Sequence, residues 1–402
     1  MRPTLRRACF LALLAVPLAA AGADQPDPAK LALIPPRMQR FVDEHQIAGA
    51  LTVVGNAKGT LSIEAVGQLR LDGPAMPKDA LFRIASMTKP ITAVGIMILA
   101  DEGKLSVDDR VEKHLPEFRG QMLVAERGAD RLVLKKPARP ITLRDLLTHT
   151  SGLPGYPPGF FNVYRKDGRT LADGALALSQ RPLEFEPGSR WAYSNSGIDT
   201  LGRVIEVVSG QDYEKFLASR IFEPLGMKDT TFRPSAEQLK RLAGLYNLKD
   251  GKLVAAPGLP AGRAAAPRPP SPAGGLYSTG ADQARFYRMM LNGGQLDGKR
   301  VLSEASVKAM TKAQTNSSDS KVGFTPGMAH GLGFAVVRTP EGVTGMLSPG
   351  TFGHGGAFGT QSWADPVRDL FVVLLIQRTG LPNSDASEMR REVQRLAFEA
   401  IK

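Results

Sequence analysis

A serine and a lysine lie three residues apart in the segment Ser86–Lys89. On a helix, residues at positions i and i+3 face the same side, so the amine can reach the hydroxyl. Serine becomes a good nucleophile when a base takes its proton, and lysine can be that base where burial or a nearby charge lowers its pKa. The spacing therefore predicts an acyl-transfer site, with Ser86 as the nucleophile and Lys89 as its proton acceptor.

A phenol and a carboxamide occur together in the segment Tyr193–Asn195, after the turn signal Pro187–Gly188 and before a helical pattern. A loop at a helix start can direct both side chains into a cleft. We predict that Tyr193 is a third catalytic residue, whose phenolate, favoured by the nearby Lys89, acts as a general base. The alternative is that the two side chains only cap the helix.

The third segment is His354–Ala357, whose two central glycines would let a substrate approach the backbone closely. The N–H groups of Ser86 and Ala357 are predicted to form an oxyanion hole. If His354 acts as a neutral imidazole, activity should fall below about pH 6, and His354→Lys should improve the binding of anionic substrates. The predicted substrate-binding residues are Asn195, His354, Gly355, Gly356 and Ala357.

The residues after Ser86 must hold the serine and lysine in register. Pro90–Ala100 is apolar almost all round and is followed by Gly103, which predicts a buried central helix. A second Ser-x-x-Lys occurs at Ser318–Lys321, but it lies in a polar stretch with no helix pattern. We therefore assign the chemistry to Ser86 alone.

Strand-like segments occur near both ends of the chain, and helix patterns fill the middle. The expected strands are 50–56, 61–67, 331–338, 357–364 and 370–377, with a closing amphipathic helix at 387–401. In the middle, Ser or Thr caps with Asp three residues later predict helix starts at Ser106, Thr142, Thr170 and Thr279. We predict an α/β fold with one sheet built from both ends and an inserted helical domain, so that the three segments meet between the two parts.

The predicted domain organisation is a signal peptide at 1–23 and one hydrolase domain at 24–402. Its α/β part covers about 24–95 and 295–402, and its helical part about 96–294. A stretch at 257–275 is rich in Pro, Ala, Gly and Arg. We interpret it as a surface linker, with a functional rim as the alternative.

The N-terminus has basic residues, a short apolar stretch and the small residues Ala21–Ala23, a pattern typical of a secretory signal peptide. We therefore expect an exported protein, periplasmic or secreted, with an uncleaved anchor as the alternative. The single cysteine, Cys9, falls in that leader, which excludes a disulfide scaffold in the mature chain. No later apolar stretch reaches membrane-spanning length.

The formal net charge of the chain is +12, which favours contact with anionic surfaces such as a cell envelope. We do not expect a nucleic-acid partner, because basic residues are not interleaved with aromatic residues. The five histidines lack metal-binding spacing, no Gly-x-Ser-x-Gly occurs, and we expect no metal and no cofactor. His149, at an expected helix end, is interpreted as a structural residue that stabilises the helix terminus.

Taken together and in order, these segments resemble the superfamily of serine β-lactamases and penicillin-binding proteins, nearest its class C β-lactamase-like branch. The resemblance runs from about Phe82 to Gln377, and its segments are Ser86–Pro90, Leu146–Leu153, Pro187–Gly188, Tyr193–Asn195, Pro224–Met227 and Gly353–Gly356. It implies an antiparallel sheet flanked by helices with an all-helical domain. It also implies that Ser86 is acylated, that Lys89 and Tyr193 share the proton transfers, and that Asn195 holds the substrate amide or the lysine.

The chain departs from this family at His354–Gly356, where β-lactamases usually carry Lys-Thr-Gly. A mostly neutral imidazole and a hydrogen atom replace a cation and a hydroxyl, so tight binding of a β-lactam carboxylate is not expected. The change resembles family VIII carboxylesterases and some D-amino-acid peptidases. The expected activity is hydrolysis of small acyl esters. The alternatives are a β-lactamase, a D-amino-acid or DD-peptidase acting on cell-wall peptides, and a non-catalytic envelope protein.

Overall fold

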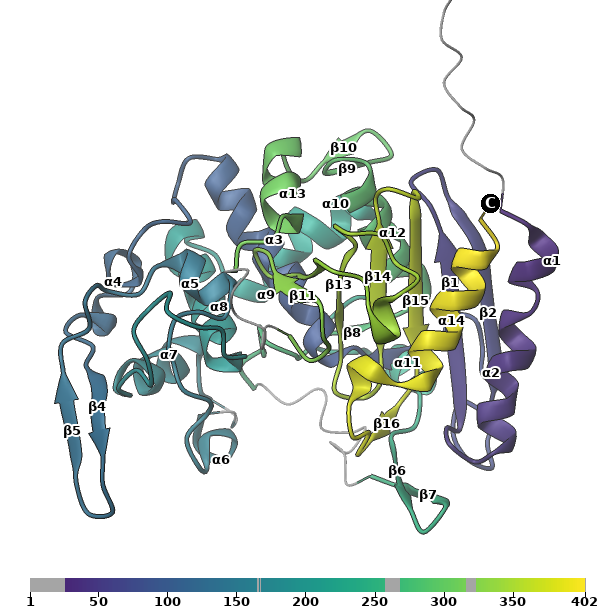
Figure 1. Cartoon of the computed structure of the whole chain (residues 1–402), viewed down its shortest axis with the longest axis horizontal. Helices are drawn as coiled ribbons and strands as arrows, with labels where there is room; N and C mark the ends of the chain where they lie inside the picture. Colours follow the sequence, from purple (N-terminus) through teal and green to yellow (C-terminus); the bar gives the residue numbers. More distant parts are fainter. Residues whose placement is uncertain (1–25, 165, 167, 257–267, 316–322, 402) are drawn as a thin grey trace, which may run out of the picture.

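The computed structural model describes residues 26–164, 166, 168–256, 268–315 and 323–401. The predicted signal peptide and the second Ser-x-x-Lys, at 318–321, lie outside these described residues. A seven-stranded antiparallel sheet forms one side of the molecule, in the order β11-β12-β13-β14-β15-β1-β2 (Figure 1). Its strands are β1 (Gly49–Gly55), β2 (Thr60–Gly67), β11 (Met328–His330), β12 (Ala335–Val337), β13 (Phe352–Gly355), β14 (Gln361–Asp365) and β15 (Leu370–Leu375).

The sheet joins the two ends of the chain, as predicted, because β1 pairs with β15 within it. The strands expected at 50–56, 61–67 and 370–377 correspond to β1, β2 and β15. The strands expected at 331–338 and 357–364 are confirmed only in their second halves, which contain β12 and most of β14. The first half of each range is a turn, and the strands before these turns, β11 and β13, were missed.

Apolar residues on both faces of β1 create two layers of core. Leu51 and Val53 face a large core shared with the helical side, whereas Ala50 and Val54 face a smaller core under the terminal helices. This alternation follows from the two-residue repeat of a strand. The terminal helices α1 (Pro28–Leu31), α2 (Ile34–Asp43) and α14 (Glu388–Glu399) cover one face, and α12 (Gly280–Leu291) covers the other.

The other side of the molecule is mainly helical (Figure 1). Its helices include α4 (Val111–His114), α5 (Leu143–Leu147), α6 (Phe160–Tyr164), α7 (Leu171–Ser179), α8 (Asn195–Ser209) and α9 (Tyr213–Leu217). The chain also forms α10 (Glu223–Leu225), α11 (Ala236–Lys240) and α13 (Glu304–Thr311). Short strand pairs complete the fold: β3 (Phe82–Arg83) with β8 (Tyr277–Ser278), β4 (Leu123–Arg127) with β5 (Leu132–Lys135), β6 (Tyr246–Lys249) with β7 (Lys252–Ala255) and β16 (Arg378–Thr379), and β9 (Gln295–Leu296) with β10 (Lys299–Arg300). The predicted boundaries of the helical part stay a prediction, although α12, inside that range, already packs on the sheet.

Three of the four predicted helix caps are confirmed. Thr142, Thr170 and Thr279 accept hydrogen bonds from the backbone N–H three residues later, at the starts of α5, α7 and α12. The fourth prediction is wrong, because Ser106 begins a turn in which Asp109 Oδ2 accepts a hydrogen bond from the Ser106 N–H. Among the described residues, no helix is both long and apolar enough to cross a membrane.

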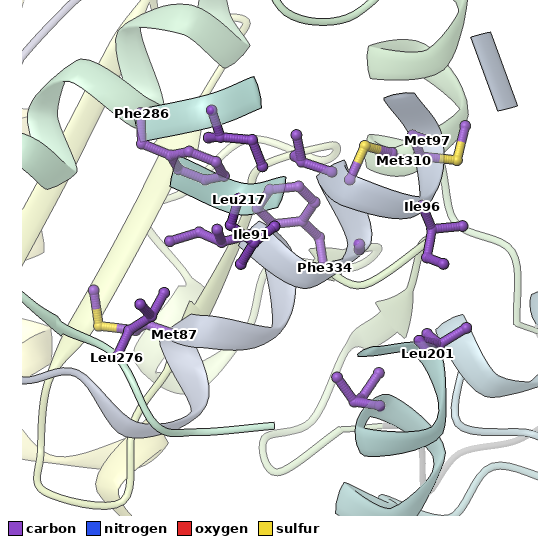
Figure 2. Packing of buried hydrophobic residues seen from close by; sticks show 14 of the residues in the cluster. Met87, Ile91, Ile96, Met97, Leu201, Leu217, Leu276, Phe286, Met310 and Phe334 are labelled. Atoms are coloured by element: carbon purple, nitrogen blue, oxygen red, sulfur yellow. The ribbon is translucent and has the colours of Figure 1, made fainter. Parts of the chain in front are cut away.

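The predicted buried helix after the serine is α3 (Thr88–Asp101), and apolar side chains surround it (Figure 2). All its residues from Thr88 to Leu99 are buried. Ile91 lies near Phe286 and Phe334 in the same cluster. The chain therefore buries Lys89 by surrounding its whole helix.

Candidate active site

Ser86 lies in a 3-10 turn, Ala85–Met87, that leads directly into α3. The residue before it, Ala85, has a φ of +45°, which is uncommon for a residue other than glycine. Thr88 Oγ1 donates a hydrogen bond to the Ala85 carbonyl at 2.7 Å and holds this backbone in place. Strained backbone of this kind persists where its surroundings fix it, and here it presents the Ser86 hydroxyl at the start of the helix.

Folding brings Ser86, Lys89 and Tyr193 together, which confirms that the first two segments meet. Lys89 Nζ lies 2.9 Å from Ser86 Oγ, and the Tyr193 hydroxyl donates to the same oxygen at 2.8 Å. The Lys89 Nζ atom also lies 4.7 Å from the centre of the Tyr193 ring. The serine oxygen therefore has a possible base and a hydrogen-bond donor within contact distance.

Lys89 is fully buried, and burial lowers the pKa of its amine from 10.5 to about 7. The negative charge of Asp199 opposes this effect, because it favours the ammonium form. Near neutral pH, a large fraction of the amine is therefore uncharged. An uncharged amine next to a serine hydroxyl can accept its proton.

The protonation state of Tyr193 differs from the prediction. Burial raises the pKa of its phenol well above the ordinary value, and the hydrogen bond to Ser86 only partly opposes that rise. The expectation of a phenolate base was wrong, because burial disfavours the charged phenolate form. Lys89 beside it offers little compensating positive charge, since a large fraction of its amine is uncharged. The hydroxyl of Tyr193 acts here as a hydrogen-bond donor to the serine oxygen.

A backbone carbonyl that the sequence analysis missed completes the lysine's surroundings. Lys89 Nζ donates to Ala273 O at 2.6 Å, and the neighbouring Pro272 O accepts from Thr92 Oγ1 at 2.7 Å. Pro272 and Ala273 are buried, so the prediction of a surface linker is wrong for this part of 257–275. Residues 257–267 lie outside the described residues.

Asn195 is the first residue of α8, directly after the helix cap Ser194. Its side chain is half-buried. Within the described part of the chain, no hydrogen bond joins Asn195 to Lys89, and the lysine donates to Ser86 and Ala273 instead. The predicted role of Asn195 in holding the substrate stays a prediction.

The third segment lies at the end of β13 rather than before a strand. Gly355 and Gly356 are required there because the protein's own atoms occupy the places of their missing side chains. A Cβ atom on Gly355 would lie 1.7 Å from Asp385 Oδ1, and one on Gly356 would lie 2.2 Å from Thr360 Oγ1. These contacts explain the need for glycine within the fold itself, and the predicted substrate-binding role of Gly355 and Gly356 stays a prediction.

The same close contacts bring Ala357 toward the nucleophile. The missing side chain of Gly356 points at Ile84 O and Ala85, the two residues before Ser86. Thr360 Oγ1 also donates to Ile84 O at 3.3 Å. Ala357 follows in an exposed turn, so the predicted pairing of its N–H with that of Ser86 in an oxyanion hole stays a prediction that the backbone arrangement favours.

His354 is buried and belongs to a group of three histidines that the sequence did not reveal. The ring centres of His149 and His330 are 4.8 Å apart, and those of His330 and His354 are 6.4 Å apart. Burial is the main cause that lowers the pKa of His330 and of His354 to about 3, and that of His149 well below its ordinary value. All three rings are therefore neutral at physiological pH, and His354 does not titrate near pH 6.

The interpretation of His149 also changes. It follows α5 with a φ of +58°, and its Nδ1 accepts a hydrogen bond from the Ser194 N–H at 3.2 Å. A neutral ring cannot stabilise a helix terminus by charge, so that part of the prediction was wrong, although the predicted structural role is supported. His149 instead ties the end of α5 to the cap of α8, and its ring lies 4.7 Å from that of Tyr193.

The aromatic side chains Trp191, Tyr193 and Phe324 lie beside these histidines, with ring centres of neighbouring members 4.9–6.4 Å apart. No group of three or more histidine, cysteine, aspartate or glutamate side chains in the described residues could hold a metal ion. The rings around Ser86 are thus aromatic and neutral, and the charged groups near them are the amine of Lys89 and the carboxylates of Asp199 and Asp385.

Comparison with known proteins gives relatives along almost the whole chain. Protein Rv1367c of Mycobacterium tuberculosis is 36% identical over 85% of this chain and 88% of its own. Esterase EstB of Burkholderia gladioli is 33% identical, over 83% of this chain and 86% of its own. The solved structure of EstCE1, a hydrolase with promiscuous acyltransferase activity, shares the fold with a TM-score of 0.75 at 24% identity, and the alignment covers 93% of this chain and 97% of that one.

The comparison with family profiles agrees with the geometry and with these relatives. The profile described as Beta-lactamase matches residues 34–397. That range includes Ser86, Lys89, Tyr193 and the end of β13. The chain belongs to the beta-lactamase family, whose members are serine hydrolases.

Proposed function

We propose that this protein is a serine esterase that hydrolyses small acyl esters through an acyl-enzyme on Ser86. The observation that carries the proposal is the contact between the Ser86 hydroxyl and a buried amine whose pKa is about 7. The relationship to esterase EstB supports the choice of ester substrates within the family.

In the proposed mechanism, neutral Lys89 takes the proton of the Ser86 hydroxyl while Oγ attacks the ester carbonyl carbon. The resulting oxyanion would accept hydrogen bonds from the N–H groups of Ser86 and Ala357. Collapse of this intermediate breaks the bond to the alcohol, which receives its proton from the Lys89 ammonium by way of the Tyr193 hydroxyl. Water then attacks the acyl-enzyme while Lys89 accepts its proton, and collapse of the second intermediate breaks the bond to Ser86 Oγ, which receives that proton from the Lys89 ammonium as the carboxylic acid leaves.

The electrostatics of the site support neutral substrates. A β-lactam carries a carboxylate, which family members usually bind with a lysine at the position of His354. Here the ring is buried and its pKa is about 3, so it offers no positive charge at physiological pH.

The experiment that tests the proposal is the Ser86→Ala variant with p-nitrophenyl acetate and butyrate. We expect hydrolysis to fall to the background rate while the circular dichroism spectrum stays that of the wild type. Ser318→Ala is the matched control, because it changes the serine of the other Ser-x-x-Lys and should keep full activity. Undiminished turnover by Ser86→Ala would end the nucleophile assignment.

A substrate panel separates the proposed activity from its rivals. Turnover of nitrocefin would indicate a β-lactamase, and release of D-alanine from a cell-wall peptide would indicate a peptidase. A non-catalytic binding protein should not react with a fluorescent phosphonate, whereas the proposed enzyme should be labelled on Ser86. The proposal requires labelling together with ester turnover above that of the other substrates.

We also propose that the protein is exported, since the first 23 residues have the pattern of a signal peptide. N-terminal sequencing of the protein from the periplasm or medium should begin at Asp24. A mature protein that begins at Met1 would contradict export by cleavage.

A further inference from the structure

The Ala273 carbonyl that binds Lys89 is itself held by a buried carboxylate. The Ala273 N–H donates to Asp199 Oδ1 at 3.0 Å, and Ala273 O accepts from Lys89 Nζ at 2.6 Å. Asp199 lies on α8 and is 6% exposed. A single residue, Ala273, therefore connects this carboxylate to the amine.

The other carboxylate oxygen also has a partner, which fixes the orientation of the group. Asp199 Oδ2 accepts a hydrogen bond from the Tyr156 hydroxyl. The Tyr156 ring stacks on Phe160, with ring centres 4.7 Å apart and an angle of 14° between the planes. Buried carboxylates are costly unless they are hydrogen-bonded, and this one is bonded through both oxygens.

The hydrogen bond to Ala273 O fixes the orientation of the Lys89 amine. An uncharged amine has two N–H bonds and one lone pair. With one N–H directed at Ala273 O, the lone pair can point at the Ser86 hydroxyl. If Ala273 moved, the amine would rotate with it, and the lone pair would lose its alignment with the proton that it must take.

Charge is the second link between Asp199 and the amine. Several titratable groups face Lys89 from the elements around α3: Asp199 on α8, Tyr193 before α8, Tyr213 on α9 beyond Thr92, His149 after α5, His330 on β11 and His354 on β13. The histidines are neutral at physiological pH, and burial keeps Tyr193 protonated. The carboxylate of Asp199 is the charge in this group that favours the ammonium form of Lys89.

We propose that Asp199 is a positioning residue for acyl transfer, which aims Lys89 at Ser86 through Ala273 and keeps that amine basic enough to accept the serine proton. The proposal rests on the proposed function of Ser86 and Lys89. It adds a residue that touches neither the substrate nor the reacting atoms.

The test is Asp199→Asn, which removes the charge and keeps the shape. Its amide oxygen can still accept from the Ala273 N–H, and its NH₂ group can donate to the Tyr156 oxygen. Without the carboxylate, the acid limb of the pH profile of kcat/KM should move about one unit toward lower pH. The plateau rate should also fall, because a weaker base takes the proton less readily. Asp173→Asn, at an exposed helix cap, is the matched control and should leave the profile unchanged.

The pH dependence separates positioning from a merely structural role. If the acid limb of kcat/KM in Asp199→Asn lies at the same pH as in the wild type, with rates lowered equally at every pH, the proposal is overturned. Tyr156→Phe is the second variant, needed if Asp199→Asn does not fold. It keeps the charge but removes the hydrogen bond from Tyr156 that orients the carboxylate, so kcat should fall about 3- to 10-fold while the acid limb stays at the wild-type pH. An unchanged kcat in Tyr156→Phe would equally count against the proposal.

The rate at which a fluorescent phosphonate labels Ser86, measured against pH, provides a readout that does not need ester turnover. If the wild-type protein is not labelled, the proposed function has failed. If the wild type is labelled and Asp199→Asn has the same pH profile of labelling, only the role of Asp199 has failed.

Discussion

Replacement of Lys89 by methionine should make the folded protein more stable while it abolishes hydrolysis. Methionine has nearly the length of lysine and no charge, so it fits a fully buried position in an apolar helix. The wild-type protein pays a desolvation cost for the ammonium whenever the lysine carries its proton. The variant removes that cost together with the proposed base.

The size of the effect follows from the pKa of Lys89. A change from 10.5 to about 7 corresponds to about 5 kcal/mol of disfavoured ammonium in the folded state. Methionine leaves Ala273 O without the hydrogen bond from Lys89, which costs about 1–3 kcal/mol. The net gain in the free energy of unfolding should therefore be about 2–4 kcal/mol at pH 7 and below.

The gain should depend on pH in a defined direction. Between about pH 7 and 10.5 the unfolded chain keeps the lysine proton and the folded chain has lost it. The unfolded state then binds more protons, so the stability of the wild type rises with pH over this window. The methionine variant lacks this rise. Its advantage should shrink by about 2.5 kcal/mol between pH 6 and 9.

Urea unfolding of both proteins at pH 6, 7.5 and 9, followed by circular dichroism, measures these differences. Lys78→Met is the matched control, because that lysine side chain is 61% exposed, and its effect should be small and nearly independent of pH. A Lys89→Met protein that is less stable than the wild type at pH 6 would refute the reasoning. An advantage that stays constant from pH 6 to 9 would refute it as well.

Three further outcomes are expected. The kcat/KM for p-nitrophenyl butyrate should fall tenfold per pH unit below about pH 7, because protonation of Lys89 removes the active form. The His354→Gln variant should keep this acid limb, and a flat profile from pH 5 to 8 would contradict the role of Lys89. Tyr193→Phe removes the donor to Ser86 Oγ and should lower kcat about 10²- to 10⁴-fold with an unchanged circular dichroism spectrum, whereas near-normal turnover would exclude a catalytic role. Gly202→Ala places a Cβ atom 2.2 Å from Pro272 Cγ, so it should cost about 1–3 kcal/mol of stability and lower kcat by displacing Ala273. Gly155→Ala, with open space at its Cβ, is the control. Equal effects of the two variants would show that Pro272 is not displaced.

The sequence predicted those parts of the fold that depend on local pattern. Alternation or continuous apolarity marked β1, β2 and β15, and Thr caps with Asp three residues later marked the starts of α5, α7 and α12. The same capping pattern was wrong at Ser106, because side-chain to backbone hydrogen bonds of this kind also close turns. Glycine-containing turns were included in expected strands at 331–338 and 357–364, since apolar residues on both sides hid them.

The candidate site was predictable where side chains carry the chemistry and not where the backbone does. The spacing of Ser86 and Lys89 and the phenol of Tyr193 are visible as residue types. The Ala273 carbonyl is not, because every residue has a carbonyl and only the tertiary fold brings this one to Lys89. The histidine group was also hidden, since His149, His330 and His354 come from three distant segments with no common spacing.

The sequence alone also could not assign the direction of proton transfer, because the two pKa values depend on burial. From the residue types alone, the Lys89 ammonium was expected to favour a phenolate on Tyr193. In the folded protein burial raises the pKa of the phenol and lowers that of the amine to about 7. The two shifts both disfavour moving the proton from Tyr193 to Lys89, so the neutral pair is the favoured form. From about pH 7 upward the amine is uncharged and the phenol keeps its proton, which leaves Lys89 as the base in both acylation and deacylation. Both steps should therefore share one acid limb, set by Lys89 and by the charge of Asp199 behind it.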